Sequence, residues 1–336
     1  MKKEIVKAEI LWTRKCNLNC VYCGMKKERE RISIEKWKEG IDNLKRLKCR
    51  FMAIYGAEPL FDFEGLPEFI KYATEQGILT TVITNGTIPD SKEKIRKLYD
   101  NGLRSLTVSY DGEDIDYDLS VGLKAKKGLE LALWFRDNFQ DLRDTALVMT
   151  ATTKNFFKLP RIIKAVAEKN LWVFFDFIHN DRGQYGTKCR DSEITRGLMF
   201  SQKDIPLIRT TIKELMELKR NGYFVHTSWD FLNMIYKNPF ILLRYAWHCA
   251  LSEEFPAWLS IDCNGEVYAC DDFQVKDRKK VFYVWEIADR YEEFAEYWKN
   301  RTLVQCPGCV WNTHIDANLI KEGVLNFDEY VHKNSS

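Results

Sequence analysis

Three cysteines lie close together near the start of the chain, in the segment Cys16-Asn-Leu-Asn-Cys20-Val-Tyr-Cys23. Three thiolates on one short loop can bind three irons of a cubane iron–sulfur cluster, and the fourth iron then has no protein ligand. A cluster that only transfers electrons uses four cysteines, whereas an open iron can bind a substrate or a cofactor. The spacing therefore predicts a reactive cluster with one open iron.

A structural zinc site is the alternative for the same three cysteines. Such a site needs four ligands, and the closest further cysteine in the sequence is Cys49, beyond a predicted helix. The chain has ten cysteines in all, and its first residues lack the apolar core and cleavage site of a secretory signal. We therefore expect a cytoplasmic protein, in which cysteines serve metal binding or reactivity rather than disulfides.

The Cys-x3-Cys-x2-Cys spacing, with the aromatic residue Tyr22 before the third cysteine, resembles the signature of the radical S-adenosylmethionine (SAM) superfamily. The resemblance implies that Cys16, Cys20 and Cys23 hold a [4Fe-4S] cluster whose open iron chelates SAM. One electron from the cluster then cleaves SAM to methionine and a 5′-deoxyadenosyl radical, which abstracts a hydrogen atom from the substrate. The protein orients and shields this chemistry, and a flavodoxin-like or ferredoxin-like protein is the expected one-electron donor.

Three further motifs resemble segments of the same family, and each follows a predicted strand. Gly56-Ala57-Glu58-Pro59 resembles a Gly-Gly-Glu-Pro motif whose backbone and Glu bind the SAM amine; Ala57 replaces the second glycine, which a negative φ would tolerate. Thr84-Asn85-Gly86-Thr87 and Ser109-Tyr110-Asp111-Gly112 resemble segments of the branch that carries extra clusters. As isolated sequences all three are common turns. The resemblance assigns to SAM binding Tyr22, Gly56, Ala57, Glu58, Pro59, Thr84, Asn85, Ser109 and Asp111, with Thr150 and Thr152 as weaker candidates.

Five more cysteines lie between residues 249 and 309. Cys249, Gly265 and Cys270, followed after a gap by Cys306-Pro-Gly-Cys309, resemble the SPASM/Twitch modules of radical SAM enzymes. The resemblance implies one auxiliary [4Fe-4S] cluster with four ligands: Cys249, Cys270, Cys306 and Cys309. Structural zinc would use the same number of ligands, and Cys263 is an alternative to Cys249. Cys49 and Cys189 are expected to be buried apolar residues or free thiols.

Asp271 directly follows Cys270. In sulfatase-maturing members of the branch, an aspartate in this position accepts a proton from the group that is oxidised, so the resemblance implies that Asp271 is catalytic. Loss of a proton and transfer of an electron to a nearby cluster would complete a two-electron oxidation. Asp272 competes for this role, and the alternative for both is a solvated carboxylate at the end of a hairpin.

The elements that must position these motifs alternate between short apolar strands and amphipathic helices. Strands are predicted at 4–12, 50–55, 79–84, 105–109, 146–150 and 172–177. Helices are predicted from about residue 33 and at 66–76, 92–101, 123–139, 160–169 and 205–220. This alternation indicates right-handed crossovers and a parallel sheet. Because the motifs follow strands, they fall at the carboxyl edge, where parallel barrels place their chemistry.

The pattern changes after residue 222. Aromatic residues and cysteines become frequent, and Asn264-Gly265 predicts a hairpin with arms at 257–261 and 266–269. The predicted fold is therefore α/β, with a partial (β/α)6 TIM-like barrel over residues 1–222. Residues 223–336 are predicted to form a small, Cys-rich α+β domain that binds the auxiliary cluster.

Composition narrows the function classes. The chain of 336 residues has 45% apolar residues and a formal net charge of +2, which disfavours nucleic-acid binding through phosphates; no apolar run is long enough to cross a membrane. We expect a maturase-type radical SAM oxidoreductase that oxidises or cross-links a peptide or protein side chain, or a small metabolite. The rival hypothesis is a non-catalytic scaffold that holds structural zinc or delivers iron–sulfur clusters.

Overall fold

The computed structural model describes residues 4–23, 29–112, 119–178, 197–244, 257–268, 280–305 and 311–327. Its main element is a curved sheet with the strand order β6-β5-β4-β3-β2-β1-β7-β8. All neighbours from β6 to β7 are parallel. The first six strands are β1 (Lys7–Thr13), β2 (Phe51–Gly56), β3 (Leu79–Thr84), β4 (Ser105–Ser109), β5 (Asp144–Ala151) and β6 (Trp172–Phe177).

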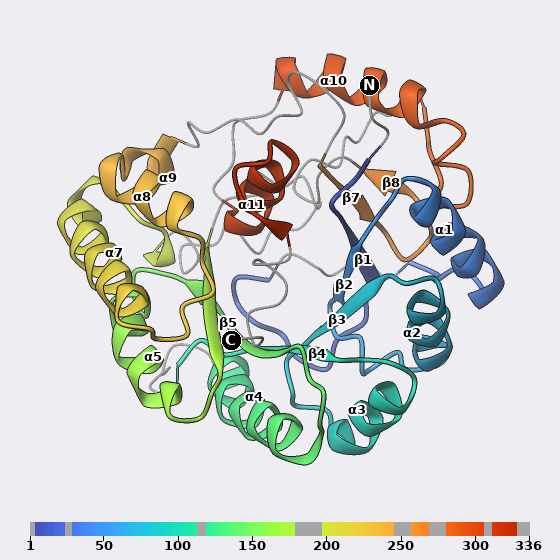
Figure 1. Cartoon of the computed structure of the whole chain (residues 1–336). Coiled ribbons are helices and arrows are strands. Elements are labelled where there is room, and N and C mark those ends of the chain that lie inside the picture. Colours follow the sequence, from blue (N-terminus) through green and yellow to red (C-terminus); the bar gives the residue numbers. More distant parts are fainter. Residues whose placement is uncertain are drawn as a thin grey trace.

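Helices connect these strands and cover the outer face of the sheet (Figure 1). They are α1 (Ile34–Arg46), α2 (Leu66–Glu75), α3 (Ser91–Asp100), α4 (Leu119–Asn138), α5 (Leu159–Ala167) and α7 (Ile205–Arg220), with the short 3-10 helices η1 (Phe156–Lys158) and η3 (Gln202–Asp204). The hydroxyl of Ser33 caps α1 by accepting from the Lys36 amide at 3.3 Å. One stripe of α1, with Trp37, Ile41 and Leu44, is buried against the sheet, as its periodicity predicts.

The predicted hairpin is present as β7 (Trp258–Ile261) and β8 (Val267–Tyr268), which pair antiparallel around Asn264-Gly265. The sequence does not predict which strand the hairpin pairs with. In the structure β7 lies parallel to β1, opposite residues Lys7 to Ile10, and so extends the barrel sheet. The segment after the hairpin packs on α1, where Asn43 Nδ2 donates to the Trp285 carbonyl at 2.9 Å. One hydrophobic core runs through both parts, so the boundary at residue 222 stays a prediction.

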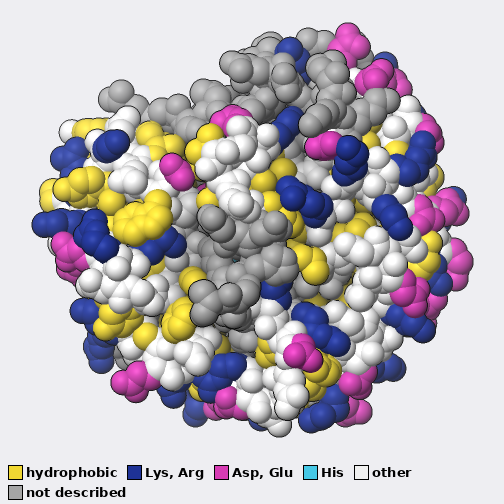
Figure 2. All heavy atoms as spheres, viewed as in Figure 1, with side chains coloured by type: hydrophobic (Ala, Val, Ile, Leu, Met, Phe, Trp, Pro, Cys, Tyr) yellow, Lys and Arg dark blue, Asp and Glu magenta, His cyan; other side chains and the backbone are white. Residues whose placement is uncertain are grey.

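Four further helices complete the described structure: α8 (Trp229–Lys237), α9 (Phe240–Arg244), α10 (Tyr291–Gln305) and α11 (Asn312–Lys321). Figure 1 shows α11 near the centre of the curved sheet, inside the ring of helices. The predicted α/β class with a mostly parallel sheet is confirmed. No helix in the described ranges is both long and apolar enough to span a membrane. On the face in Figure 2, basic and acidic side chains are interspersed, in keeping with the small net charge.

Candidate active site at the carboxyl edge of the sheet

The three N-terminal cysteines lie on the loop that follows β1. Cys20 is buried, whereas Cys16 and Cys23 are partly exposed. The Cys23 amide donates to the Cys20 carbonyl at 3.0 Å and closes a turn. The Sγ atom of Cys16 accepts hydrogen bonds from the Leu18 amide at 3.3 Å and from Asn85 Nδ2 at 3.7 Å. Burial raises the pKa of the Cys16 thiol, and the hydrogen bond from Leu18 opposes this shift.

The chemistry of this donor set is that of three thiols on one short loop. Among the described residues, no group of three or more His, Cys, Asp or Glu side chains forms a site for one metal ion. In a cubane each cysteine binds a different iron, so three thiols have to surround the cluster rather than converge on one point. N–H groups directed at cysteine sulfur, like those of Leu18 and Asn85, are contacts that tune iron–sulfur clusters. The loop therefore fits a cubane with one open iron.

Gly56 and Ala57 bring the loop after β2 against the end of β1. Gly56 has φ of 138°, and a Cβ atom there would lie 2.4 Å from the Thr13 carbonyl oxygen, so only glycine fits. The Ala57 amide donates to that carbonyl at 3.0 Å. Ala57 is not among the described non-glycine residues with positive φ, so this position accepts alanine, as expected. Pro59 is buried in the same loop.

Glu58 joins the loops after β2 and β3. Its side chain is fully buried, and Oε1 accepts from the Leu60 amide at 3.0 Å and the Thr84 hydroxyl at 2.7 Å. Oε2 accepts from the Asn85 amide at 2.7 Å. Burial raises the pKa of Glu58 to about 6, although these hydrogen bonds favour the charged form. In this structure Glu58 uses both oxygens to hold two loops together, and its assignment to the SAM amine stays a prediction.

Asn85 connects the loop after β3 to the cysteine loop. Besides its contact with Cys16, Asn85 Nδ2 donates to Asn17 Oδ1 at 3.1 Å. Asn17 Nδ2 in turn donates to the Thr87 hydroxyl at 2.8 Å. The Thr84–Thr87 motif therefore supports the first cysteine from the end of β3, which is separated from β1 by β2.

Asp111, after β4, is the centre of a buried polar triad with Tyr22 and Lys124. Its Oδ2 atom accepts hydrogen bonds from the Tyr22 hydroxyl and from Lys124 Nζ, and Lys124 also donates to the Tyr22 hydroxyl at 2.6 Å. Asp111 Oδ1 accepts from the Thr150 amide at 2.7 Å. Burial lowers the pKa of Lys124, but Asp111 together with Cys20 and Cys23 outweighs it, and the net pKa of Lys124 is raised. The triad fixes Tyr22, and with it the end of the cysteine loop.

A cavity of about 340 Å³ occupies the inside of the partial barrel. Alternate residues of the strands line it, such as Ala53, Thr107 and Val148, because every second side chain of a strand points inward. At the carboxyl edge its lining includes Tyr22, Cys23, Gly56 and Thr150, and on another side it includes Trp311 and Thr313 at the start of α11. One cavity therefore connects the cysteine loop with α11.

The structure places the remaining predicted residues apart from that cavity or outside the described ranges. Ser109 ends β4 and is partly buried, and Thr152 is buried with its amide donating to Asn155 Oδ1 at 2.7 Å. Cys263 is buried in the hairpin turn, and Cys49 is buried two residues before β2 begins. The predictions that lie outside the described residues are Cys189, Cys249, Cys270, Asp271, Asp272, Cys306 and Cys309.

Sequence reasoning missed Lys124 and Asp176. Lys124 lies on the buried stripe of α4 with Ala125, Gly128 and Leu131, and a lysine on an apolar stripe is the signal that points to a buried partner. Asp176 lies on β6 and lines the cavity, and its Oδ1 accepts from the Asn312 amide of α11 at 3.2 Å. A carboxylate inside a strand of otherwise apolar residues, WVFFDF, is the corresponding signal.

Comparison with known families and curated proteins identifies relatives. The family model of the radical SAM superfamily matches residues 10–149. An Fe-coproporphyrin III synthase from Methanosarcina barkeri is 32% identical over 230 residues, 63% of this chain and 53% of that protein. A PqqA peptide cyclase from Rhodopseudomonas palustris is 31% identical over 161 residues, 45% of this chain and 41% of that protein. The chain thus matches about half the length of these curated relatives, or less.

Comparison with solved structures supports the same fold. The crystal structure of Streptococcus suis SuiB bound to the precursor peptide SuiA superposes with a TM-score of 0.68 at 14% sequence identity. The superposition covers 95% of this chain and 73% of that chain. The similarity includes the part of this chain that follows the partial barrel.

Proposed function

Because this chain belongs to the radical SAM superfamily of enzymes, we propose that it abstracts a hydrogen atom from an organic substrate with the help of SAM. The cofactor is a [4Fe-4S] cluster held by Cys16, Cys20 and Cys23, with one iron open to SAM. When both are bound, the cluster held by these cysteines would supply one electron to SAM, and the radical chemistry for hydrogen abstraction would come from that reduction. All other steps depend on how the side chains of this chain bind, orient and shield these groups.

The observation that carries this proposal is the cavity inside the barrel. Tyr22 and Cys23 line it on the side of the cysteine loop, and apolar strand residues form much of its wall. Radical chemistry needs a site that limits side reactions with water, and the largely apolar wall of this cavity favours such a role. The volume of about 340 Å³ is at the lower end of ligand pockets, which suits a side chain or a small molecule next to the cofactor.

The residues around the loop have supporting roles in this proposal. Asn85 directs an amide at the Cys16 sulfur, and Glu58 fixes the backbone of Asn85. On the opposite side, Asp111 and Lys124 fix the Tyr22 ring. The assignment to SAM of Ser109, at the end of β4, is kept as part of the proposal, together with those of Glu58 and the other residues that the motifs contribute.

We further propose one auxiliary [4Fe-4S] cluster with Cys249, Cys270, Cys306 and Cys309 as ligands, and Asp271 as the group that accepts the substrate proton. Trp311 follows Cys309 by two residues and lines the cavity, so the C-terminal cysteine pair is close in sequence to the proposed reaction chamber. Cys263 is less suitable than Cys249 as the fourth ligand. Its thiol is fully buried and donates to the Arg29 carbonyl at 3.7 Å.

A peptide or protein side chain is the substrate that we propose, oxidised or cross-linked after hydrogen abstraction. Its support is the similarity to a PqqA peptide cyclase and to SuiB, whose structure contains a precursor peptide. A tetrapyrrole is the second candidate, because the similarity to an Fe-coproporphyrin III synthase spans 230 residues.

Anaerobic reconstitution with iron and sulfide, followed by reduction with dithionite in the presence of SAM, tests the proposal. We expect about eight irons per chain, as two four-iron clusters require, and formation of 5′-deoxyadenosine detected by mass spectrometry. Cys16→Ser should abolish the product, whereas Cys49→Ser, which changes a thiol buried elsewhere, should retain it. A protein that binds zinc, or that forms no 5′-deoxyadenosine although it holds iron, supports the scaffold hypothesis instead.

The substrate class is tested with two probes in the same assay. A pooled peptide library should increase 5′-deoxyadenosine formation and yield peptides that have lost two hydrogen atoms. A panel of iron tetrapyrroles other than Fe-coproporphyrin III, which is the named product of the Methanosarcina barkeri relative, should leave the rate unchanged. Stimulation by a tetrapyrrole of the panel, and not by peptides, would replace the peptide proposal with the second candidate.

A further inference from the structure

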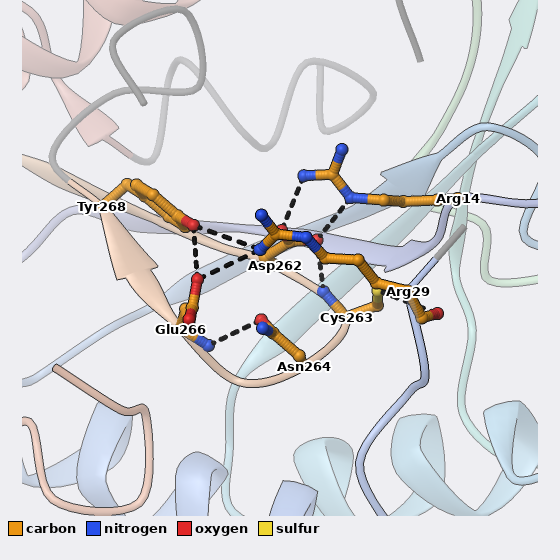
Figure 3. Close-up of polar contacts among 7 residues, drawn as sticks. All are labelled: Arg14, Arg29, Asp262, Cys263, Asn264, Glu266 and Tyr268. Carbon is orange, nitrogen blue, oxygen red and sulfur yellow. Dashed lines mark hydrogen bonds and ion pairs between the residues drawn. The ribbon is translucent and has the colours of Figure 1, made fainter. Parts of the chain in front are cut away.

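A group of charged side chains lies between the cysteine loop and the β7–β8 hairpin (Figure 3). We name it the Asp262 cluster, and it consists of Arg14, Arg29, Asp262 and Glu266. Arg14 directly follows β1, and Asp262 directly follows β7. Because β1 and β7 are parallel and Ile10 lies opposite Ile261, the ends of the two strands meet at the same edge of the sheet. The hairpin thereby reaches the base of the cysteine loop.

The carboxylate of Asp262 accepts four hydrogen bonds. Arg14 binds it with both arms of its guanidinium, Nε to Oδ1 at 3.0 Å and Nη2 to Oδ2 at 2.6 Å. Arg29 Nη1 donates to Oδ2 at 2.9 Å, and the Cys263 amide donates to Oδ1 at 2.8 Å. Bidentate arginine–carboxylate pairs restrict orientation as well as distance. Arg14 precedes Cys16 by two residues and Arg29 follows Cys23 by six, so one carboxylate holds both flanks of the loop.

Burial makes this contact sensitive to the loss of one charge. The side chain of Asp262 is 0% exposed and that of Arg14 is 3% exposed, whereas Arg29 is 36% exposed. Arg29 also contacts Glu266 Oε2 at 3.1 Å, so two guanidinium groups face two carboxylates. A buried charge is tolerated when it is paired, and removal of its partner is strongly unfavourable. Without Asp262, Arg14 would remain buried with excess positive charge.

Backbone contacts reinforce the same connection. The Ile32 amide donates to the Cys263 carbonyl at 3.0 Å, and the Cys263 thiol donates to the Arg29 carbonyl. The segment after the cysteine loop therefore lies along the hairpin turn. The hairpin leads within two residues of its last strand to Cys270, one of the proposed ligands of the auxiliary cluster.

We propose that Asp262 is a positioning residue that holds the three-cysteine loop in place from the C-terminal part of the chain. The loop geometry then depends on the hairpin, and the hairpin links the two groups of cysteines. This inference rests on the proposed function, because it treats the loop as the binding site of the SAM-cleaving cluster. The contacts themselves exist without any cluster, so they are testable on the metal-free chain.

Thiol labelling of the metal-free, full-length chain tests this role. Cys20 and Cys49 are both buried, but Cys20 is in the loop and Cys49 lies far from it in sequence, two residues before β2 begins. The two thiols are labelled with N-ethylmaleimide at constant pH, and peptide mass spectrometry measures the labelling rate of each thiol. For Asp262→Asn we expect the Cys20 rate to rise by about tenfold or more while Cys49 stays protected, since local release exposes only the loop. Asp289→Asn, which removes an exposed partner of Arg46, should change neither rate.

An unchanged Cys20 rate in Asp262→Asn would overturn the proposal. If both thiols become reactive because that variant unfolds, Arg29→Gln serves as the milder change, since Arg29 is partly exposed. Selective labelling of Cys20 in Arg29→Gln supports the proposal, and equal or unchanged labelling of both thiols refutes it. Failure of the chain to form 5′-deoxyadenosine would reject the proposed function without altering these rates. In the reconstituted enzyme, Asp262→Asn should raise the KM for SAM more than it lowers kcat.

Discussion

Glu58 is a buried carboxylate that joins the ends of two neighbouring strands. Glu58→Gln keeps the size of the side chain. The NH2 group of the glutamine, however, would face groups that now donate hydrogen bonds to the Glu58 carboxylate. We expect the free energy of unfolding of the metal-free chain to fall by about 1–3 kcal/mol, measured by urea denaturation. Glu68→Gln is the control, because Glu68 is half-exposed in its pair with Lys38, and it should change stability by less than about 0.5 kcal/mol. Equal losses would contradict the role of Glu58.

The raised pKa of Glu58 predicts a pH dependence with a defined sign. The pKa is about 6 in the folded chain and 4.5 for an unperturbed carboxyl, so the folded state binds the proton more tightly. The stability gained from protonation is therefore complete below pH 4.5 and is lost as the pH rises through 6. Relative to Glu58→Gln, the wild type should lose about 2 kcal/mol over this interval. Urea denaturation of both proteins at several pH values checks this, and a constant difference would refute it.

The cysteines of the C-terminal part differ in the roles that we predict. Burial, together with the Asp262 carboxylate, raises the pKa of the Cys263 thiol to about 12. The same thiol donates a hydrogen bond to the Arg29 carbonyl in the hairpin turn, so we predict that it is not a cluster ligand. After reconstitution, Cys263→Ala should keep about eight irons per chain, whereas Cys249→Ala should lose about four. Iron and sulfide analysis of the two variants decides between them. The reverse pattern would make Cys263 the fourth ligand.

At the scale of elements, α4 is fitted closely against the loops that carry the site. A Cβ atom on Gly128 would lie 2.7 Å from the Ser109 carbonyl oxygen, and one on Gly86 would lie 2.8 Å from the Gly128 Cα. Gly128→Ala must therefore push α4 away, although alanine is the better helix residue. We expect a loss of about 1–3 kcal/mol in the free energy of unfolding. Gly197→Ala, where a Cβ atom meets nothing within 4 Å, is the control, and equal stability of the two variants would contradict this packing.

Strand and helix positions follow from the sequence because their signals are local. The strands expected at 79–84, 105–109 and 172–177 have those bounds in the structure, since each is a short apolar run between turn residues. The pairing of β7 with β1 did not follow, because it joins residues about 250 positions apart and leaves no periodic signal. Arg29 was missed for the same reason, since Asp262 is far from it in sequence, whereas Lys124 carries a local signal that does not name its partner. Their partners Asp111 and Asp262 are identified only by the fold.

At the scale of the whole molecule, the sheet crosses the predicted domain boundary at residue 222. β7 covers the edge of β1, and buried residues of both parts, such as Trp12 and Trp258, belong to one core. Removal of residues 223–336 would expose the backbone of β1 as an open edge, and exposed edges pair with other chains. It would also leave Arg14 without Asp262.

A chain truncated after residue 222 should therefore aggregate or unfold, although the sequence pattern predicts residues 1–222 to form a partial barrel as a domain of their own. The physical reason is that a parallel strand is stabilised from both sides, and β1 would lose one neighbour together with the apolar side chains of β7. Size-exclusion chromatography and thermal unfolding of the truncated and full chains measure this difference. The full chain provides the control in the same buffer. A monomeric truncated chain with a cooperative transition at the temperature of the full chain would show that the barrel is independent, and the two parts would then be domains in the ordinary sense.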